Sequence, residues 1–346
     1  MGDIFSKVNR FRMIAVLIAA ILIISGGMAA ASGQSIIDEA KKEKKLSLYT
    51  SMNVADAMTL LQEFKKKYPF ITTEIYRSKS IALLNKIPQE TKAKRYTADV
   101  ITSTFTIWND LKKEGQLMKY RSPESLNFPA KMKDPEDYWT VLYLQIQGMA
   151  YNTRMVSAKT APQKYEDLLI PAWKGGKKIA MDYHEEPWFA VMLEIMGKEK
   201  GLALMKKLSE QTLYLRDNKT LLTNLLVAGE FPVLANTYMD NVIVLKRAGA
   251  PVEWVPGYNP IPASTHLAGI YAYAPHPNVA KLYIDFLLSH DGQKLLMQMG
   301  NSPVRSGVDT DLMQYTRGFD IHPVNPSMMA EYSTTTKLYR EIFWKQ

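Results

Sequence analysis

Residues 46–80 read LSLYTSMNVADAMTLLQEFKKKYPFITTEIYRSKS, and this stretch decides the fold class. The runs Leu46–Thr50 and Ile71–Tyr76 are rich in β-prone residues and predict two strands. Between them, Ala55–Lys67 predicts a helix, because its large apolar residues recur at helical spacing. A strand, a helix and a strand in this order predict a βαβ unit with two parallel strands.

The alternation continues outward along the chain, which predicts an α/β fold. Two groups of elements follow, the second beginning near Gly148. The predicted strands are Ala98–Ser103, Gly148–Asn152, Lys178–Met181, Phe231–Asn236 and Leu267–Ala274, and the predicted helices are Ile81–Lys92, Phe189–Met196, Gly201–Leu208, Leu221–Ala228 and Asn278–Ser289. No Ser, Gly or Pro-rich linker separates the groups, so the pattern favours two lobes joined by crossing strands.

Composition excludes several classes of protein. The chain has 346 residues, of which 47% are hydrophobic and 22% charged, so it is an ordered globular protein of about two domains. It contains no Cys, which excludes disulfides, thiolate metal sites, a Cys nucleophile and a lipoprotein anchor. The net charge is +9, but Lys and Arg are scattered, which favours a solvated basic surface over a nucleic-acid-binding face.

The N-terminus has the pattern of an export signal. Lys7, Arg10 and Arg12 precede the apolar run Met13–Ile24, and small residues follow, ending in Ala29-Ala30-Ala31. We expect residues 1–31 to be a cleaved signal peptide and the mature protein to be periplasmic. An uncleaved membrane anchor is the alternative, because the weakly apolar stretch approaches a spanning length of about 20 residues.

The order of several segments resembles the bacterial periplasmic solute-binding proteins of the ferric-iron type. The most specific segments are YEDLLIPAWKGGKKIAM, which contains Asp167–Gly175, and LLVAGEFPVLANTY, which contains Ala228-Gly229-Glu230. The resemblance covers Leu46 to Arg305 and implies a hinged, two-lobe type II periplasmic binding fold. It also implies a solute carrier for an inner-membrane ABC permease.

On this interpretation the lobes have discontinuous boundaries. We expect lobe 1 to comprise residues 32–144 and 262–305, and lobe 2 to comprise residues 145–261 and 306–346. The crossing segments near Leu144–Gly148 and Pro260–Thr265 would then form the hinge.

Ligands of α/β sheets bind beyond the carboxyl ends of the strands, which locates the candidate site. In lobe 1 these positions hold small polar residues and one Arg, and the start of the following helix favours anions. Ser78 or Ser80 could instead cap the N-terminus of this helix rather than contact a ligand. Asn218–Thr220 is a second such helix start. The predicted ligand-binding residues are Ser51, Asn53, Arg77, Ser78, Ser80, Ser103, Thr104, Asp182, Tyr183, Trp188, Asn236, Tyr238 and Tyr258.

The resemblance raises ferric iron as an alternative ligand. Relatives of that type hold iron with two adjacent tyrosines, but here Tyr238 is followed by Met239, and Thr104 lies in the region of the usual glutamate. A trivalent cation prefers anionic oxygen ligands, and this set is largely neutral. We therefore predict a small anionic or polar organic solute, with Tyr238 as a metal ligand only on the iron hypothesis.

A periplasmic enzyme is the third hypothesis. No nucleophile elbow, P-loop, zinc-binding H-E-x-x-H or dinucleotide-binding motif follows a predicted strand, and the five His residues lack metal-ligand spacing. We therefore expect a monomeric binding protein that has no catalytic activity, no cofactor and no nucleic-acid partner.

Overall fold

The computed structural model describes residues 36–308, 311–324 and 332–344. The expected leader, residues 1–31, lies outside the described residues. Among the helices of the described ranges, none is long and apolar enough to cross a membrane.

Lobe 1 is built on the βαβ unit that the sequence predicts. β1 (Lys45–Thr50) pairs in parallel with β2 (Thr72–Arg77), and α2 (Val54–Lys67) connects them. β3 (Val100–Thr104) pairs in parallel with the other edge of β1. The remaining helices and strands of this lobe are α3 (Ser80–Lys92), α4 (Trp108–Lys113), β4 (Leu117–Met118), α9 (Pro277–Leu288), α10 (His290–Gln298) and β11 (Ser302–Pro303).

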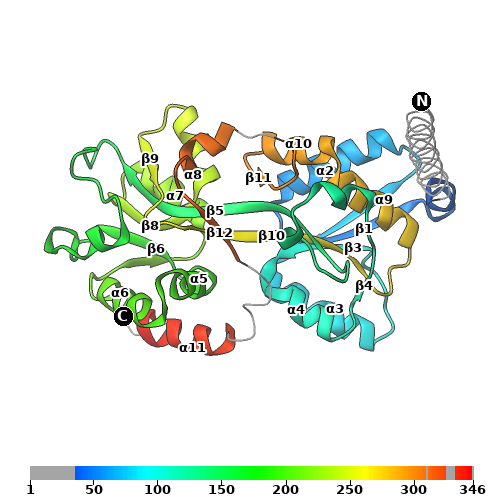
Figure 1. Ribbon diagram of the computed structural model, residues 1–346, viewed down its shortest axis with the longest axis horizontal. Helices are drawn as coiled ribbons and strands as arrows, with labels where there is room; N and C mark the ends of the chain where they lie inside the picture. The colour runs from blue at the N-terminus through cyan, green and yellow to red at the C-terminus, as the bar shows by residue number, and fades with distance from the viewer. Residues whose placement is uncertain (1–35, 309–310, 325–331, 345–346) are drawn as a thin grey trace, which may run out of the picture.

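Lobe 2 repeats this architecture. β6 (Ile179–Asp182) lies between β7 (Tyr214–Arg216) and β8 (Val233–Tyr238) and is parallel to both. Its other elements are α5 (Glu186–Met196), α6 (Lys198–Ser209), α7 (Lys219–Ala228), α8 (Met239–Arg247), β9 (Val252–Val255) and α11 (Tyr332–Phe343), with β12 (Ile321–Pro323) beside the crossing strands. Figure 1 shows α11 lying along α5, at the lower edge of this lobe.

Two long strands join the lobes. β5 (Thr140–Asn152) and β10 (Ile261–Tyr271) are antiparallel and run along the long axis of the molecule (Figure 1). The sheet order β2-β1-β3-β10-β5-β8-β6-β7 puts them at its centre. β5 pairs with β10 up to Ile146 and with β8 and β9 from Gln147 onward. It therefore passes from the lobe 1 half of the sheet to the lobe 2 half between these two residues.

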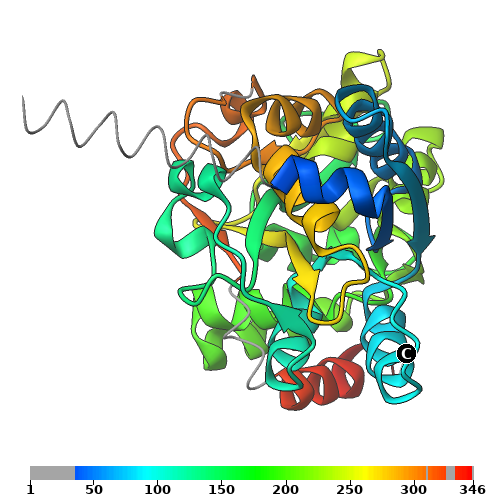
Figure 2. The ribbon, with the colours of Figure 1, turned by 90° about the vertical axis from the view of Figure 1, so that its right-hand side faces the viewer.

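Helices cover the sheet on both sides in each lobe, as the end-on view in Figure 2 shows for lobe 1. One buried apolar cluster extends from β3 and α4 through the crossing strands to α7 and α8. Two more clusters fill the outer parts, one around α2 and α9 and the other around α5 and α6. The predicted two-lobe α/β architecture is therefore confirmed.

The main differences from the predicted elements lie in the crossing strands. β5 begins at Thr140, eight residues before the predicted strand at Gly148, and β10 begins at Ile261 rather than Leu267. Both extensions are almost wholly buried, including polar residues such as Gln147 and Ser264, so apolar periodicity does not reveal them. Helix α8 was also not predicted.

Candidate functional site

Four hydroxyl side chains meet at the carboxyl ends of β1 and β3. Ser103 Oγ lies 3.1 Å from Ser51 Oγ and donates to Ser80 Oγ at 2.9 Å, and Ser80 Oγ lies 2.8 Å from Thr104 Oγ1. We call Ser51, Ser80, Ser103 and Thr104 the hydroxyl cluster. The elements that bring them together are β1, β3 and the first residue of α3, as expected for a site at strand ends.

The start of α3 is not capped by a side chain. Lys79 is its N-cap residue and makes no side-chain cap bond, and the first turn has no acidic residue. Ser78 and Ser80 therefore do not act as caps, which settles the alternative that the sequence left open. Free N–H groups and the helix dipole make such a start a site of positive potential.

Arg77 and Asn53 lie beside the cluster, and both are exposed. Arg77 Nε donates to the Met52 carbonyl at 3.3 Å, which ties the end of β2 to the loop after β1. Asn53 accepts from the Ala55 N–H at 2.9 Å and is the N-cap of α2. Asn53 therefore has a structural role that its place in the predicted site did not indicate.

In lobe 2, a buried ion pair lies behind the ends of β6 and β8. Glu185 Oε2 accepts from Lys219 Nζ at 2.6 Å and from Asn236 Nδ2 at 2.9 Å. Glu185 and Asn236 are both fully buried. Lys219 belongs to the predicted helix start Asn218–Thr220, but sequence reasoning missed Glu185 and its pairing with Lys219.

The ion pair sets the charge around Tyr238. Burial by itself lowers the pKa of Lys219, but attraction to Glu185 outweighs it, so the net direction is upward and the ammonium stays charged. Lys219 Nζ lies 4.9 Å from the centre of the Tyr238 ring. Burial raises the pKa of Tyr238 even though Lys219 acts in the opposite direction. Tyr238 is therefore a neutral phenol at neutral pH.

Asp182 organises the loops of lobe 2. Its carboxylate accepts from the His184 N–H at 2.9 Å and from the Asn218 N–H at 3.2 Å. Asn218 Oδ1 in turn accepts from the N–H groups of Thr220 and Leu221 and caps α7. The expectation of a second open helix start at Asn218–Thr220 was therefore wrong, because the Asn218 side chain fills it.

The three predicted aromatic residues of lobe 2 have different surroundings. Trp188 is fully buried and packs against Tyr165, with ring centres 5.3 Å apart, so it belongs to the core and does not wall the cleft. Tyr183 stacks on Trp344 of the C-terminal segment at 4.7 Å. Tyr258 is half-buried and packs against the core cluster of α5 and α6.

The crossing strands connect the two halves of the site. His266 on β10 pairs in register with Thr104, and Gln147 on β5 pairs with Tyr238. Gln147 accepts from Asn236 Nδ2 at 3.3 Å and donates to Ser264 Oγ at 2.6 Å. Polar side chains thus continue from one lobe to the other between Thr104 and Tyr238.

One ion pair bridges the lobes directly. Lys79 Nζ, at the start of α3, lies 3.1 Å from Asp217 Oδ2, just before α7. Both side chains are more than half exposed. The contact brings the start of α3 against the Asp217–Asn218 turn, so the hydroxyl cluster and the Lys219 network lie in the region between the lobes.

The chain is similar in sequence to a family of bacterial proteins and to an individual bacterial protein. Residues 96–317 match the family model described as bacterial extracellular solute-binding protein. An uncharacterised protein of Haemophilus influenzae is 26% identical over 293 residues, which cover 79% of this chain and 81% of that protein.

Solved structures share the fold at lower identity. Iron-bound HitA from Pseudomonas aeruginosa matches with a TM-score of 0.74 and 20% identity, covering 86% of this chain and 99% of its own. AfuA from Actinobacillus pleuropneumoniae, with fructose-6-phosphate bound, matches with a TM-score of 0.74 and 21% identity, covering 87% and 99%. The substrate-binding protein of an Agrobacterium tumefaciens ABC transporter has a TM-score of 0.77 and 18% identity, covering 87% and 94%. The chain therefore has the type II periplasmic binding fold.

Proposed function

This chain belongs to the bacterial extracellular solute-binding protein family, and we propose that it captures a small organic anion between its lobes for an inner-membrane ABC permease. The observation that carries the ligand class is the hydroxyl cluster beside the uncapped start of α3. Hydroxyl and backbone N–H donors together suit a phosphate or carboxylate group. Arg77 adds positive charge at the rim.

Lobe 2 is suited to the uncharged part of such a solute. Glu185 Oε1 and Asn236 Oδ1 are buried and accept no hydrogen bond from the described residues. The Tyr238 phenol, which is half-buried in front of these oxygens, can exchange hydrogen bonds with hydroxyl groups of the solute. A phosphorylated or carboxylated polyol would then contact both lobes at once. Fructose-6-phosphate, bound in the AfuA structure, has this chemistry.

Ferric iron remains the alternative, and the charges around Tyr238 argue against it. Binding Fe³⁺ would need a phenolate, whereas burial raises the pKa of Tyr238. The Lys219 ammonium next to the ring would also repel a trivalent cation. HitA carries iron on the same fold, so the fold alone does not decide between the two ligands.

The rest of the proposal follows from family membership and the N-terminal sequence. The mature protein works in the periplasm as a monomer, after removal of residues 1–31, and it binds its solute without chemical turnover. Delivery of the solute requires contact with the permease, and the fold shared with the substrate-binding protein of the Agrobacterium tumefaciens ABC transporter supports this part of the proposal.

The first test identifies the solute and then removes one hydroxyl. Native mass spectrometry of protein isolated from the periplasm should show a retained organic anion. Ser80→Ala should weaken calorimetric binding of that anion about 10–100-fold, because a charge-assisted hydrogen bond contributes roughly 1.5–3 kcal/mol. Thr59→Val, on the outer part of α2, is the matched control and should bind like the parent.

Iron binding has its own readout. Ferric citrate is added to the parent and to Tyr238→Phe, and visible absorption is recorded. The anion proposal predicts no tyrosinate–iron band. A band in the parent that disappears in Tyr238→Phe, together with unchanged anion binding in Ser80→Ala, would establish the iron hypothesis instead.

A further inference from the structure

A cavity lies in lobe 2, away from the region between the lobes. Its volume is about 680 Å³, and it lies among the residues that precede β6 and β8, including Lys178 and Pro232. The candidate site lies at the opposite, carboxyl ends of the same strands. A strand of four residues is about 13 Å long, so the cavity is separated from the solute site by the sheet.

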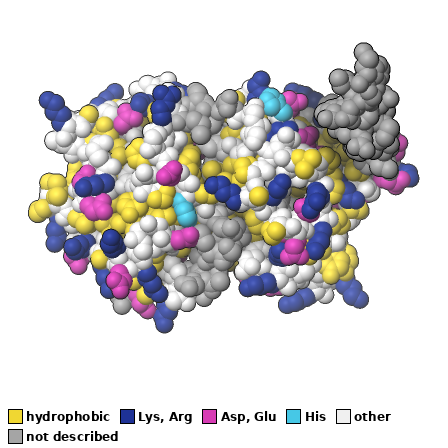
Figure 3. Space-filling view, viewed as in Figure 1, with side chains coloured by type: hydrophobic (Ala, Val, Ile, Leu, Met, Phe, Trp, Pro, Cys, Tyr) yellow, Lys and Arg dark blue, Asp and Glu magenta, His cyan; other side chains and the backbone are white. Residues whose placement is uncertain are grey.

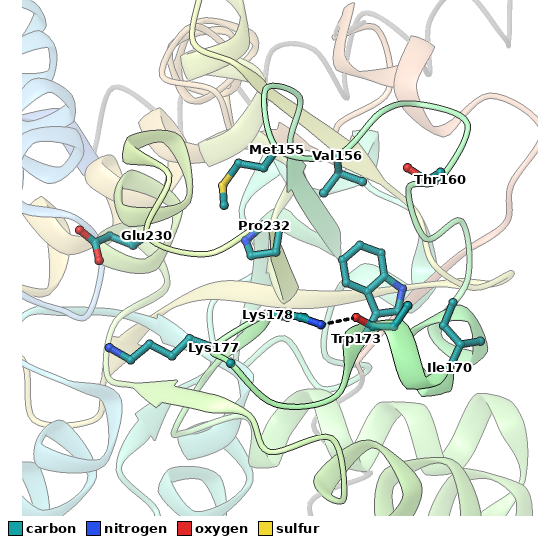
Figure 4. Close-up of a pocket in the computed structure, with 11 residues that line it drawn as sticks. Met155, Val156, Thr160, Ile170, Trp173, Lys177, Lys178, Glu230 and Pro232 are labelled. Atoms are coloured by element: carbon teal, nitrogen blue, oxygen red, sulfur yellow. Dashed lines mark hydrogen bonds between the residues drawn. The ribbon is translucent and has the colours of Figure 1, made fainter.

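The cavity has a mostly apolar lining. Met155 and Val156 contribute from the segment after β5, Ile170 and Trp173 from a loop, and Pro232 from the start of β8 (Figure 4). Met155 and Ile170 are about half exposed, at 50% and 49%. Large apolar side chains left in contact with water around a hollow of this size are typical of small-molecule sites.

Three charged residues line the cavity, and they are not evenly placed. Lys177 and Glu230 both lie toward the left of Figure 4, and Lys177 Nζ is 5.0 Å from the centre of the Tyr214 ring. Lys178 extends toward the other end and donates to the Ala172 carbonyl at 2.8 Å, beside Trp173. The Lys178 ammonium therefore lies at the Trp173 end of the cavity, away from the Glu230 carboxylate.

The backbone holds this rim in a defined shape. Gly175, Gly176 and Lys177 all have positive φ, at 70°, 63° and 55°. The Gly175 N–H donates to the Gln211 carbonyl at 2.9 Å and the Lys178 N–H to the Gly175 carbonyl at 3.3 Å. Three successive left-handed residues fixed by hydrogen bonds turn the chain sharply, so that Lys177 and Lys178 extend in different directions.

We infer that this cavity is a second binding site, specific for a small amphipathic organic anion. The apolar body lies along Met155, Val156 and Pro232, and the anionic group lies at Lys178 beside Trp173. The charge of the lining, two Lys against one Glu, favours a single negative charge. A medium-chain or aromatic carboxylate has this chemistry and fits the volume.

The experiment uses the mature protein and decanoate as the probe. Isothermal titration should give one site per chain with a Kd of about 0.1–1 mM, in the range that ligands of this size reach. The methyl resonance of Met155, assigned by Met155→Leu, should shift on titration. Decanol, which has no charge, should bind at least tenfold more weakly.

Variants separate this site from the solute site and from non-specific effects. Lys178→Met should weaken decanoate binding about tenfold, whereas Lys174→Met, an exposed neighbour outside the lining, should not. Ile170→Asp should abolish binding, whereas Leu126→Asp, the same kind of change at a more exposed apolar residue of lobe 1, should not. Ser80→Ala should leave decanoate binding intact, so the two proposals fail independently.

Three outcomes would overturn the inference. The first is the absence of saturable decanoate binding in the folded parent. The second is equal loss in Lys174→Met and Lys178→Met, which would mean a general charge effect. The third is binding only to vesicles of phosphatidylglycerol with none to free decanoate, which would make the surface a membrane contact. Thermal unfolding of each variant confirms that it is folded.

Discussion

At the residue scale, the buried groups of the site are neutralised or protonated, whereas free charge is carried by exposed residues such as Arg77. Lys219 is paired with Glu185, and the Tyr238 phenol keeps its proton. His266 is buried, and burial lowers its pKa to about 3, so it is neutral at physiological pH. These nearly neutral polar groups suit hydrogen-bond recognition of the hydroxylated part of the solute, while its anionic group lies at the start of α3.

Asp240 is the exception, and it gives a pH-dependent prediction. Burial raises the pKa of Asp240, its own backbone N–H lowers it by donating to the carboxylate, and the charge of Asp56 in lobe 1 raises it, so that the pKa is about 7. In the unfolded chain its pKa is 3.8, so the folded state binds more protons between pH 4 and 7. The contribution of Asp240 to stability is therefore largest at acidic pH and declines as pH rises to about 7.

Asp240→Asn removes this ionisation. We expect it to stabilise the protein at pH 8 by roughly 1–2 kcal/mol, allowing for partial exposure of the carboxylate, and to leave stability at pH 4 unchanged. Urea unfolding at the two pH values measures the difference. An equal effect at both would show that titration of Asp240 is not its cause.

At the element scale, the position where β5 passes from one half of the sheet to the other is tightly packed. Gly148 lies just after this point, and a Cβ placed on it would lie 2.5 Å from the Val255 carbonyl oxygen and 2.7 Å from the Trp254 ring. Only glycine leaves room for β9 to pair alongside β5. The close approach of backbones thus explains a glycine inside a buried strand.

Gly148→Ala should therefore destabilise the protein by about 2–3 kcal/mol, since backbone atoms of β9 would have to move. Gly115→Ala is the comparison. Gly115 has φ of 65° and open space around it, so its cost of about 1 kcal/mol comes from backbone conformation alone. Denaturant unfolding of both variants tests the ranking, and a smaller loss for Gly148→Ala would refute the packing argument.

At the scale of the whole molecule, charges are mixed on the surface, and an exposed ion pair joins the two lobes. On the face shown in Figure 3, Lys and Arg alternate with Asp and Glu rather than forming one basic patch. The Lys79–Asp217 pair is the contact between the start of α3 and the turn before α7. Because it is exposed, we expect it to contribute at most about 1 kcal/mol to closure.

Reversing one charge should open the molecule. Lys79→Glu places two carboxylates opposite each other, so we expect a larger radius of gyration in small-angle scattering and solute affinity lower by about fivefold. The swap Lys79→Glu with Asp217→Lys should restore both values. If the single variant scatters like the parent with and without solute, the pair has no part in closure.

The hinge remains a prediction at this scale. β5 changes sheet partners between Ile146 and Gln147, inside the predicted segment Leu144–Gly148, while the other predicted segment overlaps the start of β10. A solute that contacts both lobes shifts the population toward the closed form. Saturating solute should therefore compact the parent protein in scattering.

The sequence by itself determined the α/β class, the parallel pairing of β1 with β2, and the hydroxyl residues at strand ends. Local periodicity carries that information, because helix and strand spacing are read within about ten residues. Ser51, Ser80, Ser103 and Thr104 were predicted for this reason, although they are up to 53 positions apart.

Only the tertiary structure decided which polar groups are partners. Glu185 and Lys219 are 34 positions apart in the sequence, and Glu185 and Asn236 are 51 positions apart. Helix and strand periodicity does not extend over such separations, so it cannot predict these contacts. Asn218 and Trp188 show the converse. Asn218 was predicted to start an anion-binding helix end, but its side chain caps α7. Trp188 was predicted to wall the cleft, but it is buried in the core. Capping and burial depend on what packs around a residue, which the local sequence does not show.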